Sequence, residues 1–565
     1  MEGRMARQEG LYYVALGGAG EIGMNLYLYG YGSQNDRRWI AVDCGIGFPE
    51  EAHAPGVEVM TPDISFLKRE AGRLDALFIT HAHEDHIGAL EYLWPELNCP
   101  IYAGKFAAAI GRGKLAEARI DAKAIREMAP GERVTVGAFT VETFAMTHSA
   151  PETNALIIRT PVGTIFHSAD FKIDRTPMPG QGAPIDEEAL KRLGDEGILA
   201  LACDSTNVFQ EGWSRSESSL KDSLREIIAA RKGRVAATSF ASNVARVKML
   251  AEAAIEAGRQ VSVAGRAMRR MIEAALETGV IDSFPPVTSE ERMRDLPDHE
   301  AFYLVTGSQG ESRAALARIA EGQFSGVDLG DGDTVIFSSR IIPGNENGVY
   351  RIYNKLAEKG VEVVDVDRHH VHVSGHARRD EIARLYELLR PKLAIPMHGE
   401  FRHLLEHARM AGEWGADQAV LAPNGRLARL GPGAPKVLET VETGRMYVDG
   451  HQLIGAMDGV VRARRKMAMN GHIAVTLVVD KAGELIADPE ARALGAPEES
   501  SSWRGSFEDQ ITAAVETAVE AMSAKARRSD GSLEEAAVLA TRRVSAALWG
   551  KKPEVSVTVV RLDEN

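Results

Sequence analysis

The sequence predicts a multidomain α/β protein, in which an inserted parallel α/β domain interrupts a strand-rich domain and a small α+β domain follows. Between residue 11 and about 170 the apolar runs are short and bounded by turns, which is typical of strands with occasional helices. Between residues 216 and 365 helical and strand patterns alternate, which is typical of a parallel sheet flanked by helices. From residue 467 onward the pattern is strand, two helices and strand.

Length and composition agree with several folded domains. The chain has 565 residues, more than one domain usually contains, and its 44% of hydrophobic residues suffices to bury cores. The strand KLAIPMHGE after the insertion completes the first domain. The predicted division is 1–215 and 366–447 for the first domain, 216–365 for the insertion, 448–466 for a linker and 467–565 for the C-terminal domain.

The C-terminal domain carries no metal-ligand cluster and no obvious nucleophile in its sequence, so we interpret it as an interaction or dimerisation module. Each of its two helices is expected to begin at a capping box, in which a serine and an acidic residue three positions later satisfy free N–H groups. The pairs are Ser506 with Asp509 and Ser532 with Glu535.

The expected location is the cytoplasm, without a membrane partner. No apolar run approaches the roughly 20 residues that cross a bilayer, and the first residues lack the apolar segment of a signal peptide. Cys44, Cys99 and Cys203 are too few and too scattered for a disulfide framework. They fit small buried residues in a reducing compartment.

The net charge of −14 disfavours a nucleic-acid partner, because a polyanion is repelled by an acidic surface. Local basic clusters could still line a track for a polyanion, and solvated helix faces are an equally good interpretation of each cluster. They are Arg266, Arg269 and Arg270, then Arg378 and Arg379, then Arg462, Arg464, Arg465 and Lys466. The charge therefore lowers the expectation of RNA binding without excluding it.

Residues 17–23 match the spacing of a dinucleotide-binding loop, G-x-G-x-x-G, and follow a predicted strand. That fingerprint requires a helix that opens at its last glycine, because the helix N-terminus holds the pyrophosphate. The segment that follows, MNLYLYGYG, alternates like a strand. We therefore predict a glycine-rich turn between two strands and no nicotinamide or flavin site.

The motif His81-Ala82-His83-Glu84-Asp85-His86 lies between a predicted strand and a predicted helix. Zinc binds imidazole nitrogen and carboxylate oxygen, and catalytic zinc sites keep one position for water. On such a loop His81 and His83 can converge on one metal while Asp85 and His86 turn toward a second. A polar loop without metal is disfavoured, because packing imidazoles without a cation or partner is costly.

Further ligands are expected at strand ends, where His148, Asp170 and His398 lie. His148 would complete the first metal, His398 the second, and Asp170 would bridge both. Because no thiolate takes part, this ligand set favours two zinc ions per chain and leaves manganese or magnesium as alternatives.

This ordered set resembles the metallo-β-lactamase superfamily, and within it the beta-CASP nucleases and the bacterial ribonuclease J family. The likeness rests on HAHEDH, on Asp204 in CDSTN, His376 in HVSGHA and His398 in MHGE, and on GGAGEIG, DCGIGFPE, VTGSQGE and SSRIIPGNE. Ala82 and Ala89 stand where glycine is frequent and affect no ligand. The resemblance implies a metallo-β-lactamase αββα sandwich with an inserted beta-CASP domain and a small α+β C-terminal domain.

The resemblance also implies a zinc-dependent ribonuclease in which a hydroxide between the metals attacks phosphorus, since zinc lowers the pKa of water from about 15.7 toward about 7. The resemblance implies the same division of ligands between the two metals as the motif spacing does, with Asp170 on both. His376 would donate a hydrogen bond or proton to the phosphate. Asp43 and Asp204 would orient imidazoles, with turn caps at strand ends as the alternative for both.

In this family a cleft holds single-stranded RNA and a pocket grips its 5′ monophosphate, which implies a 5′-to-3′ exoribonuclease with internal cleavage possible. Candidates for the pocket are Ser374, Gly375 and His376, with Ser338, Ser339 and Arg340 as lesser candidates that fit a structural turn equally well. The resemblance further implies ribosomal RNA maturation, messenger RNA decay, a homodimer or homotetramer, and RNA-decay or ribosome-associated partners.

Three alternatives are weighed against this function. A DNA-directed beta-CASP enzyme commonly carries valine at the position of His398, so the histidine favours RNA. A thioester or lactone hydrolase needs no inserted domain to form a long cleft. A non-catalytic scaffold is disfavoured because every predicted ligand is present.

Overall fold

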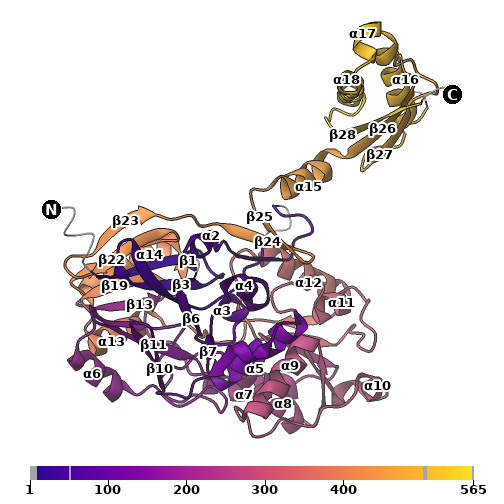
Figure 1. The fold of residues 1–565 in the computed structure, drawn as a ribbon. Helices are drawn as coiled ribbons and strands as arrows, with labels where there is room; N and C mark the ends of the chain where they lie inside the picture. Colours follow the sequence, from indigo (N-terminus) through magenta and orange to yellow (C-terminus); the bar gives the residue numbers. More distant parts are fainter. Residues whose placement is uncertain (1–8, 50–52, 71, 500–504, 563–565) are drawn as a thin grey trace. The chain divides into compact units, whose positions relative to one another are not determined.

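The computed structural model describes residues 9–49, 53–70, 72–499 and 505–562 (Figure 1). The chain divides into two compact units, which we call unit 1 (Met1–Phe48 and Val59–Met446) and unit 2 (Pro49–Glu58 and Tyr447–Asn565). Within the described ranges no helix combines the length and the apolar character needed to cross a membrane.

Unit 1 contains an eight-stranded sheet that is antiparallel around its first strands and parallel toward the other edge. In spatial order its strands are β23 (Lys436–Thr440), β22 (Arg426–Gly431), β1 (Gly10–Gly17), β3 (Leu26–Ser33), β4 (Asp36–Val42), β6 (Leu74–Ile79), β7 (Ile101–Ala103) and β8 (Ile125–Glu127). The parallel edge, from β4 to β8, carries the first half of the candidate site at its carboxyl end.

A seven-stranded sheet faces the first one across a shared core. In spatial order its strands are β21 (Gln418–Ala419), β19 (Leu393–Met397), β13 (Ala200–Asp204), β12 (Gly163–His167), β11 (Asn154–Thr160), β10 (Phe139–Ala145) and β9 (Arg133–Val136). The strands from β21 to β12 are parallel, and β12 to β9 are antiparallel. The parallel strands carry the second half of the candidate site.

Helices cover the outer faces of both sheets, as the expected αββα sandwich requires (Figure 1). On the seven-stranded sheet α6 (Glu187–Glu196), α13 (Arg379–Leu389) and α14 (Phe401–Glu413) close a second core. The helices α2 (Ser65–Arg69), α3 (Glu84–Ile87), α4 (Leu90–Leu97) and α5 (Lys105–Glu117) belong to the other layer, where α5 contacts β7 and β8.

The insertion forms a fully parallel five-stranded sheet, which confirms the prediction from the alternating pattern. Its strands in spatial order are β15 (Gln260–Ala264), β16 (Ala301–Val305), β14 (Val235–Thr238), β17 (Thr334–Phe337) and β18 (Glu362–Val364). One face packs on α7 (Lys221–Ala229), α8 (Val244–Glu256) and α9 (Arg266–Thr278), and the other on α10 (Glu290–Met293), α11 (Ala315–Ala320) and α12 (Glu346–Glu358).

From residue 472 on, unit 2 is a three-stranded sheet covered by helices, with one strand and one short helix more than predicted. Its elements are β26 (His472–Val479), β27 (Glu490–Leu494), α16 (Phe507–Glu520), α17 (Ala524–Arg527), α18 (Asp530–Leu548) and β28 (Glu554–Arg561). Alternate residues of β26 are buried against α16 and α18, so the alternation in the sequence marks the core face.

The two predicted capping boxes have opposite outcomes. Ser506 and Asp509 form the expected box at the start of α16. The box at Ser532 is wrong, because α18 begins at Asp530 and Ser532 lies inside its first turn. That turn is closed by the N–H of Leu533 on the carbonyl of Ser529, and Arg561 pairs with Asp530.

The stretch expected as a linker, 448–466, holds β25 (Gln452–Gly455) and most of helix α15 (Gly459–Asn470). Arginine, lysine, methionine and alanine favour helix in this segment, and Gly471 ends it. The stretch predicted as a linker therefore contains the start of a helix.

The glycine-rich turn at residues 17–23 is a connection between strands, as predicted. The chain passes from β1 through the short strand β2 (Ala19–Gly20) into β3, without the helix that a dinucleotide would need. β2 pairs with β20 (Gly399–Glu400), which directly follows His398. The turn is thus hydrogen-bonded to the segment that follows His398 and helps to fix the position of this site residue.

Candidate metal centre and active site

Most of the predicted site residues lie at the carboxyl ends of parallel strands. In the eight-stranded sheet Asp43 follows β4 and His81 follows β6. In the seven-stranded sheet Asp170 follows β12, Asp204 ends β13 and His398 follows β19. Because parallel strands end at the same edge of a sheet, these residues meet where the two sheets face each other.

Three histidines from two loops form the first group: His81 and His83 follow β6, and His148 follows β10. Nε2 of His81 and Nε2 of His148 lie 3.0 and 3.1 Å from Nδ1 of His83. Nδ1 of His148 donates to the carbonyl of Gly375 at 2.7 Å, so its Nε2 presents a lone pair. Nδ1 of His83 carries at most one proton, so it cannot donate a hydrogen bond to both of the facing Nε2 atoms. A cation between the three rings would accept the lone pairs of all three nitrogens.

The second group combines the last two residues of the motif, which lie in α3, with His398 after the insertion and with Asp170. Asp85 and His86 belong to α3, and Oδ2 of Asp85 lies 3.3 Å from Nε2 of His398 and 3.5 Å from Nε2 of His86. Oδ2 of Asp170 lies 3.2 Å from Nε2 of His86. Four candidate ligand atoms of imidazole and carboxylate type thus face one another.

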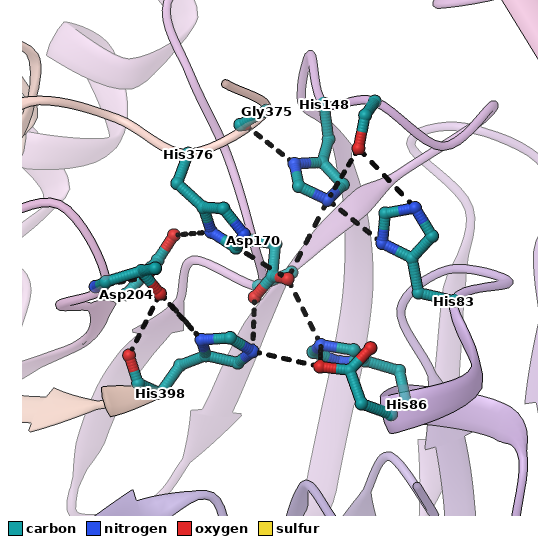
Figure 2. A network of polar contacts seen from close by, with 12 residues as sticks. His83, His86, His148, Asp170, Asp204, Gly375, His376 and His398 are labelled. Atoms are coloured by element: carbon teal, nitrogen blue, oxygen red, sulfur yellow. Dashed lines mark hydrogen bonds and ion pairs between the residues drawn. The ribbon is translucent and has the colours of Figure 1, made fainter. Parts of the chain in front are cut away.

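Asp170 belongs to both groups (Figure 2). Its Oδ2 lies 3.8 and 3.7 Å from Nε2 of His81 and of His148, and its Oδ1 lies 3.5 Å from Nε2 of His398. Oδ1 is buried without a hydrogen-bond partner in the structure, and such an atom is costly unless a cation or a donor meets it. This orphaned oxygen and the donor set fit a carboxylate that bridges two metal ions.

The electrostatics of the three histidines in the first group and of Asp170 fit cations. In the second group burial is outweighed by facing carboxylates, Asp170 first, which raise the pKa of His86 and of His398. Burial lowers the pKa of His81 and of His148 well below the usual range and that of His83 to about 4, so these rings are neutral at pH 7. Burial alone would raise the pKa of Asp170, but the facing histidines, His398 and His86 first, hold it well below its usual range. Neutral imidazoles and ionised carboxylates are the protonation states that bind metal.

Two further carboxylates contact the rings from behind. Asp43 accepts from Nδ1 of His86 at 2.7 Å, and Asp204 accepts from Nδ1 of His376 at 2.8 Å. Asp204 also accepts from the N–H of Thr206, so the orienting and turn-capping interpretations both describe it. The sequence reasoning missed Thr206 and its counterpart Thr80, which also contact these carboxylates.

His376 is a member of neither group, but it forms a third group of candidate ligand atoms with Asp170, Asp204 and His398. Its ring centroid is 5.1 Å from that of His148 and 5.4 Å from that of His398, and its side chain is 23% exposed. Burial opposes its charge, but Asp204 and Asp170 raise its pKa to about 9. A protonated, partly exposed imidazole can donate to an incoming phosphate.

The candidates for a phosphate pocket differ in what they offer. Gly375 packs against the His148 ring, where an added Cβ would lie 2.8 Å from Cε1. Ser374 accepts from the side chain of Asn207 and from the N–H of His376, which leaves its own proton for another partner. Buried Ser338 donates to the carbonyl of Val371 and accepts from Arg246. Ser339 is buried at the same strand end, and Arg340 is exposed.

One more contact was missed by the sequence reasoning. The side-chain amide of Asn25 donates to the backbone carbonyl of Asp85 at 2.9 Å and lies 3.0 Å from Nε2 of His86. Asn25 stands in an alternating strand sequence, so nothing in the pattern marked it. By contrast, His370, His372, His403 and His407 lie outside all three ligand groups found among the described residues.

Comparison with known families agrees with this architecture. Family models match residues 38–192 as a beta-lactamase superfamily domain, 232–356 as a ribonuclease J beta-CASP domain, 360–420 as a Zn-dependent metallo-hydrolase RNA specificity domain and 459–562 as a ribonuclease J C-terminal domain. Fold and site together define a metal-dependent hydrolase of the metallo-β-lactamase superfamily with a beta-CASP insertion.

Relatives extend the match over the whole chain. Ribonuclease J of Sinorhizobium meliloti is 42% identical over 99% of this chain and 98% of its own length. Ribonuclease J 1 of Streptococcus pyogenes is 38% identical over 85% of each chain. A crystal structure of an Enterococcus faecalis protein of unknown function shares the fold, with a TM-score of 0.50 over 74% of this chain and 99% of its own.

The chain therefore belongs to the ribonuclease J family, which confirms the expected family, fold class and enzyme class. At this level of description it is a metal-dependent ribonuclease.

Proposed function

We propose that this protein uses two zinc ions to hydrolyse phosphodiester bonds of single-stranded RNA, proceeding from a 5′-monophosphate end. The observation that supports the proposal most directly is the pair of ligand groups that share Asp170, with His376 beside them. The ligands of one ion would be His81, His83 and His148, those of the other Asp85, His86 and His398, with Asp170 on both. Manganese or magnesium is the alternative occupant.

Bound zinc would supply an acidified water as nucleophile and positive charge for the phosphate oxygens. Side chains and backbone groups of the protein would orient the ligands and supply the proton. The carboxylate of Asp43 holds His86 with its Nε2 toward the site, and the carbonyl of Gly375 does the same for His148. His376 would donate its proton to the phosphate or the leaving oxygen, with Asp204 stabilising the charged imidazolium behind it.

A terminal phosphate would be held by groups from the loop at 374–376 and from the inserted domain. The free proton of Ser374 and the exposed guanidinium of Arg340 suit a phosphate, with Ser339 at the same strand end. Ser338 would contribute only through Arg246, because its own proton is given to Val371. An anchor for the 5′ end gives exonucleolytic, 5′-to-3′ action, and a looped strand would give internal cleavage.

The cellular role follows from the family. We propose a cytoplasmic enzyme of ribosomal RNA maturation and messenger RNA decay that works as a homodimer or homotetramer, with RNA-decay or ribosome-associated proteins as partners. The support is the likeness to curated ribonucleases J over 99% of the chain.

The decisive experiment compares two 5′-labelled copies of one RNA, with monophosphate and triphosphate ends, and the matching single-stranded DNA. We expect labelled mononucleotide from the monophosphate RNA alone. Arg340→Ala should abolish that end preference, while Arg351→Ala, on helix α12 of the same inserted domain, should preserve it. Equal internal fragments from both RNA copies, or equal cleavage of DNA, would contradict the proposal.

A further inference from the structure

Behind each metal group a threonine hydroxyl stands between a carboxylate and an imidazole. Thr80 is fully buried, and its Oγ1 donates to Asp43 at 3.0 Å. The same Oγ1 lies 3.0 Å from Nδ1 of His81. A hydroxyl has one proton and two lone pairs, so once it donates to Asp43 it can only accept from His81.

The same arrangement recurs on the other sheet. Oγ1 of Thr206 donates to Oδ1 of Asp204 at 2.7 Å and lies 2.8 Å from Nδ1 of His398. The chain connections differ: Thr80 precedes its histidine directly, whereas Thr206 lies two residues after its carboxylate. Two unrelated local sequences thus produce one chain of hydrogen bonds, from imidazole to hydroxyl to carboxylate.

This chain of hydrogen bonds decides where the imidazole proton sits. Nδ1 of His81 must carry a proton to donate to Thr80, and its Nε2 then offers a lone pair toward the metal groups. The same reasoning places a proton on Nδ1 of His398, so that its Nε2, which faces Asp85 and Asp170, is the nitrogen left to bind a cation. The opposite tautomer would place N–H at the position of the cation and two acceptors against each other at the hydroxyl.

The hydroxyls are not needed to hold the carboxylates in place. The backbone N–H of Thr80 donates to Oδ1 of Asp43 at 2.8 Å, and that of Thr206 donates to Oδ1 of Asp204 at 2.8 Å. Each carboxylate also accepts directly from another histidine. The contribution that only the hydroxyl makes is the contact with the second histidine, through the imidazole in both cases and, for Thr206, also through the carbonyl of His398 at 3.2 Å.

We propose that Thr80 and Thr206 are positioning residues that select the metal-binding tautomer of His81 and His398, so that each carboxylate controls two imidazoles. The inference rests on metal binding by these groups and not on the RNA-end preference. Orienting partners of this kind commonly change metal affinity by about 10- to 100-fold.

The test measures zinc binding without RNA. Metal-free Thr80→Val and Thr206→Val keep the shape and lose the hydroxyl, while Thr80→Ser and Thr206→Ser keep the hydroxyl. Thr153→Val is the control, because among the described residues the buried Thr153 hydroxyl hydrogen-bonds to the carbonyl of Ala150 and to no site residue. Zinc affinity and stoichiometry are read by competition with a chromogenic chelator, and circular dichroism checks the fold.

Each valine variant should bind one of its zinc ions about 10- to 100-fold more weakly. The serine variants and the control should bind as the unsubstituted protein does. Equal binding by the valine variants, or serine variants as weak as valine, would overturn the proposal. A failure of the predicted 5′-end preference, with zinc binding as expected here, would contradict the proposed function and leave this inference standing.

A second measurement does not depend on the valine variants folding. Histidine labelled with ¹⁵N in the metal-free protein reports the tautomer of each ring, with His81→Gln and His398→Gln to assign the signals. We expect protons on Nδ1 of His81 and of His398. A proton on Nε2 alone at either ring would contradict the inference.

Discussion

The two sheets contribute the same hydrogen-bonded arrangement to the site at different exposures. The Asp43 half consists of Asp43, Thr80, His81 and His86, and the Asp204 half of Asp204, Thr206, His376 and His398. Every side chain of the Asp43 half is buried, whereas His376 in the Asp204 half is 23% exposed. On the proposed function, the buried half would serve metal binding alone, while the partly exposed His376 in the other half would be left for the substrate.

Both halves also place a strained residue just after a strand. Asp43 has φ +64° and His398 has φ +49°, a left-handed conformation that non-glycine residues rarely adopt. Such residues cost on the order of 1 kcal/mol each and persist where the surrounding structure holds them. Here the strain turns a carboxylate or an imidazole from the strand end into the space between the sheets.

The largest effect is expected at Asp170, which joins the two halves. Asp170→Asn keeps the shape and removes the charge that both ion positions share. We expect loss of both metal ions by elemental analysis and a fall in kcat/KM above about 10⁴-fold, the upper range for one acid–base group. Asp333→Asn, at a buried carboxylate of the inserted domain, is the control and should retain both ions. Retention of metal and activity by Asp170→Asn would remove the shared-ligand interpretation.

The second prediction compares the two histidines that donate directly to these carboxylates, His86 to Asp43 and His376 to Asp204. His376→Ala should lower kcat by about 10²- to 10⁴-fold with both metal ions retained, because on the proposed mechanism its proton would go to the phosphate or the leaving oxygen. His86→Ala should release one ion, because its Nε2 faces Asp170 and Asp85. Metal content and single-turnover rates on 5′-monophosphorylated RNA measure both. Metal loss in His376→Ala would mean that the open half is a third ligand position.

The third effect compares the carboxylates themselves. Asp43→Asn should weaken zinc binding by about 10- to 100-fold, because His86 loses its charged acceptor. Asp204→Asn should also lower kcat at saturating zinc, because the charge that stabilises protonated His376 is removed. Excess zinc should therefore rescue Asp43→Asn and leave Asp204→Asn slow. Equal rescue of both variants would erase the functional difference between the halves.

Much of this architecture could be predicted because its signals are local. The motif at 81–86 stands between apolar runs of strand and helix length, and in the structure it follows β6 and runs into α3. The alternation of strands and helices in the insertion reflects burial of every strand between two helix layers. Most of the predicted ligands also lie close together because they follow parallel strands, whose carboxyl ends lie at the same edge of each sheet.

What the sequence could not provide depends on contacts between distant segments. Thr80 and Thr206 are ordinary residues until the fold places each between a carboxylate and an imidazole. Gly375 was interpreted as part of a phosphate pocket, yet its carbonyl orients His148 from 227 residues away. The false capping box at Ser532 shows the same limit, because a tertiary ion pair between Arg561 and Asp530 accompanies the earlier start of α18.

The smallest effect concerns the layer behind the Asp204 half, where His407 contacts the hydroxyls of Ser205 and Tyr386 at 2.9 and 3.0 Å. Burial lowers its pKa to about 4, so the folded protein binds this proton less readily than the unfolded chain does. Its contribution to stability is complete above about pH 6.5 and is lost as the pH falls toward 4. Between pH 7.5 and 5 the loss amounts to about 2 kcal/mol.

His407→Gln should therefore flatten the fall in the free energy of unfolding of the metal-free protein between pH 7.5 and 5, while exposed His299→Gln should leave it unchanged. Urea titration followed by tryptophan fluorescence measures this, since the Trp414 ring lies 5.5 Å from His407. An equally steep fall in the His407 variant would show that acid acts on this half through the metal-site histidines instead. The two halves would then differ only in exposure, and the layer around His407 would contribute nothing to the pH dependence of the free energy of unfolding.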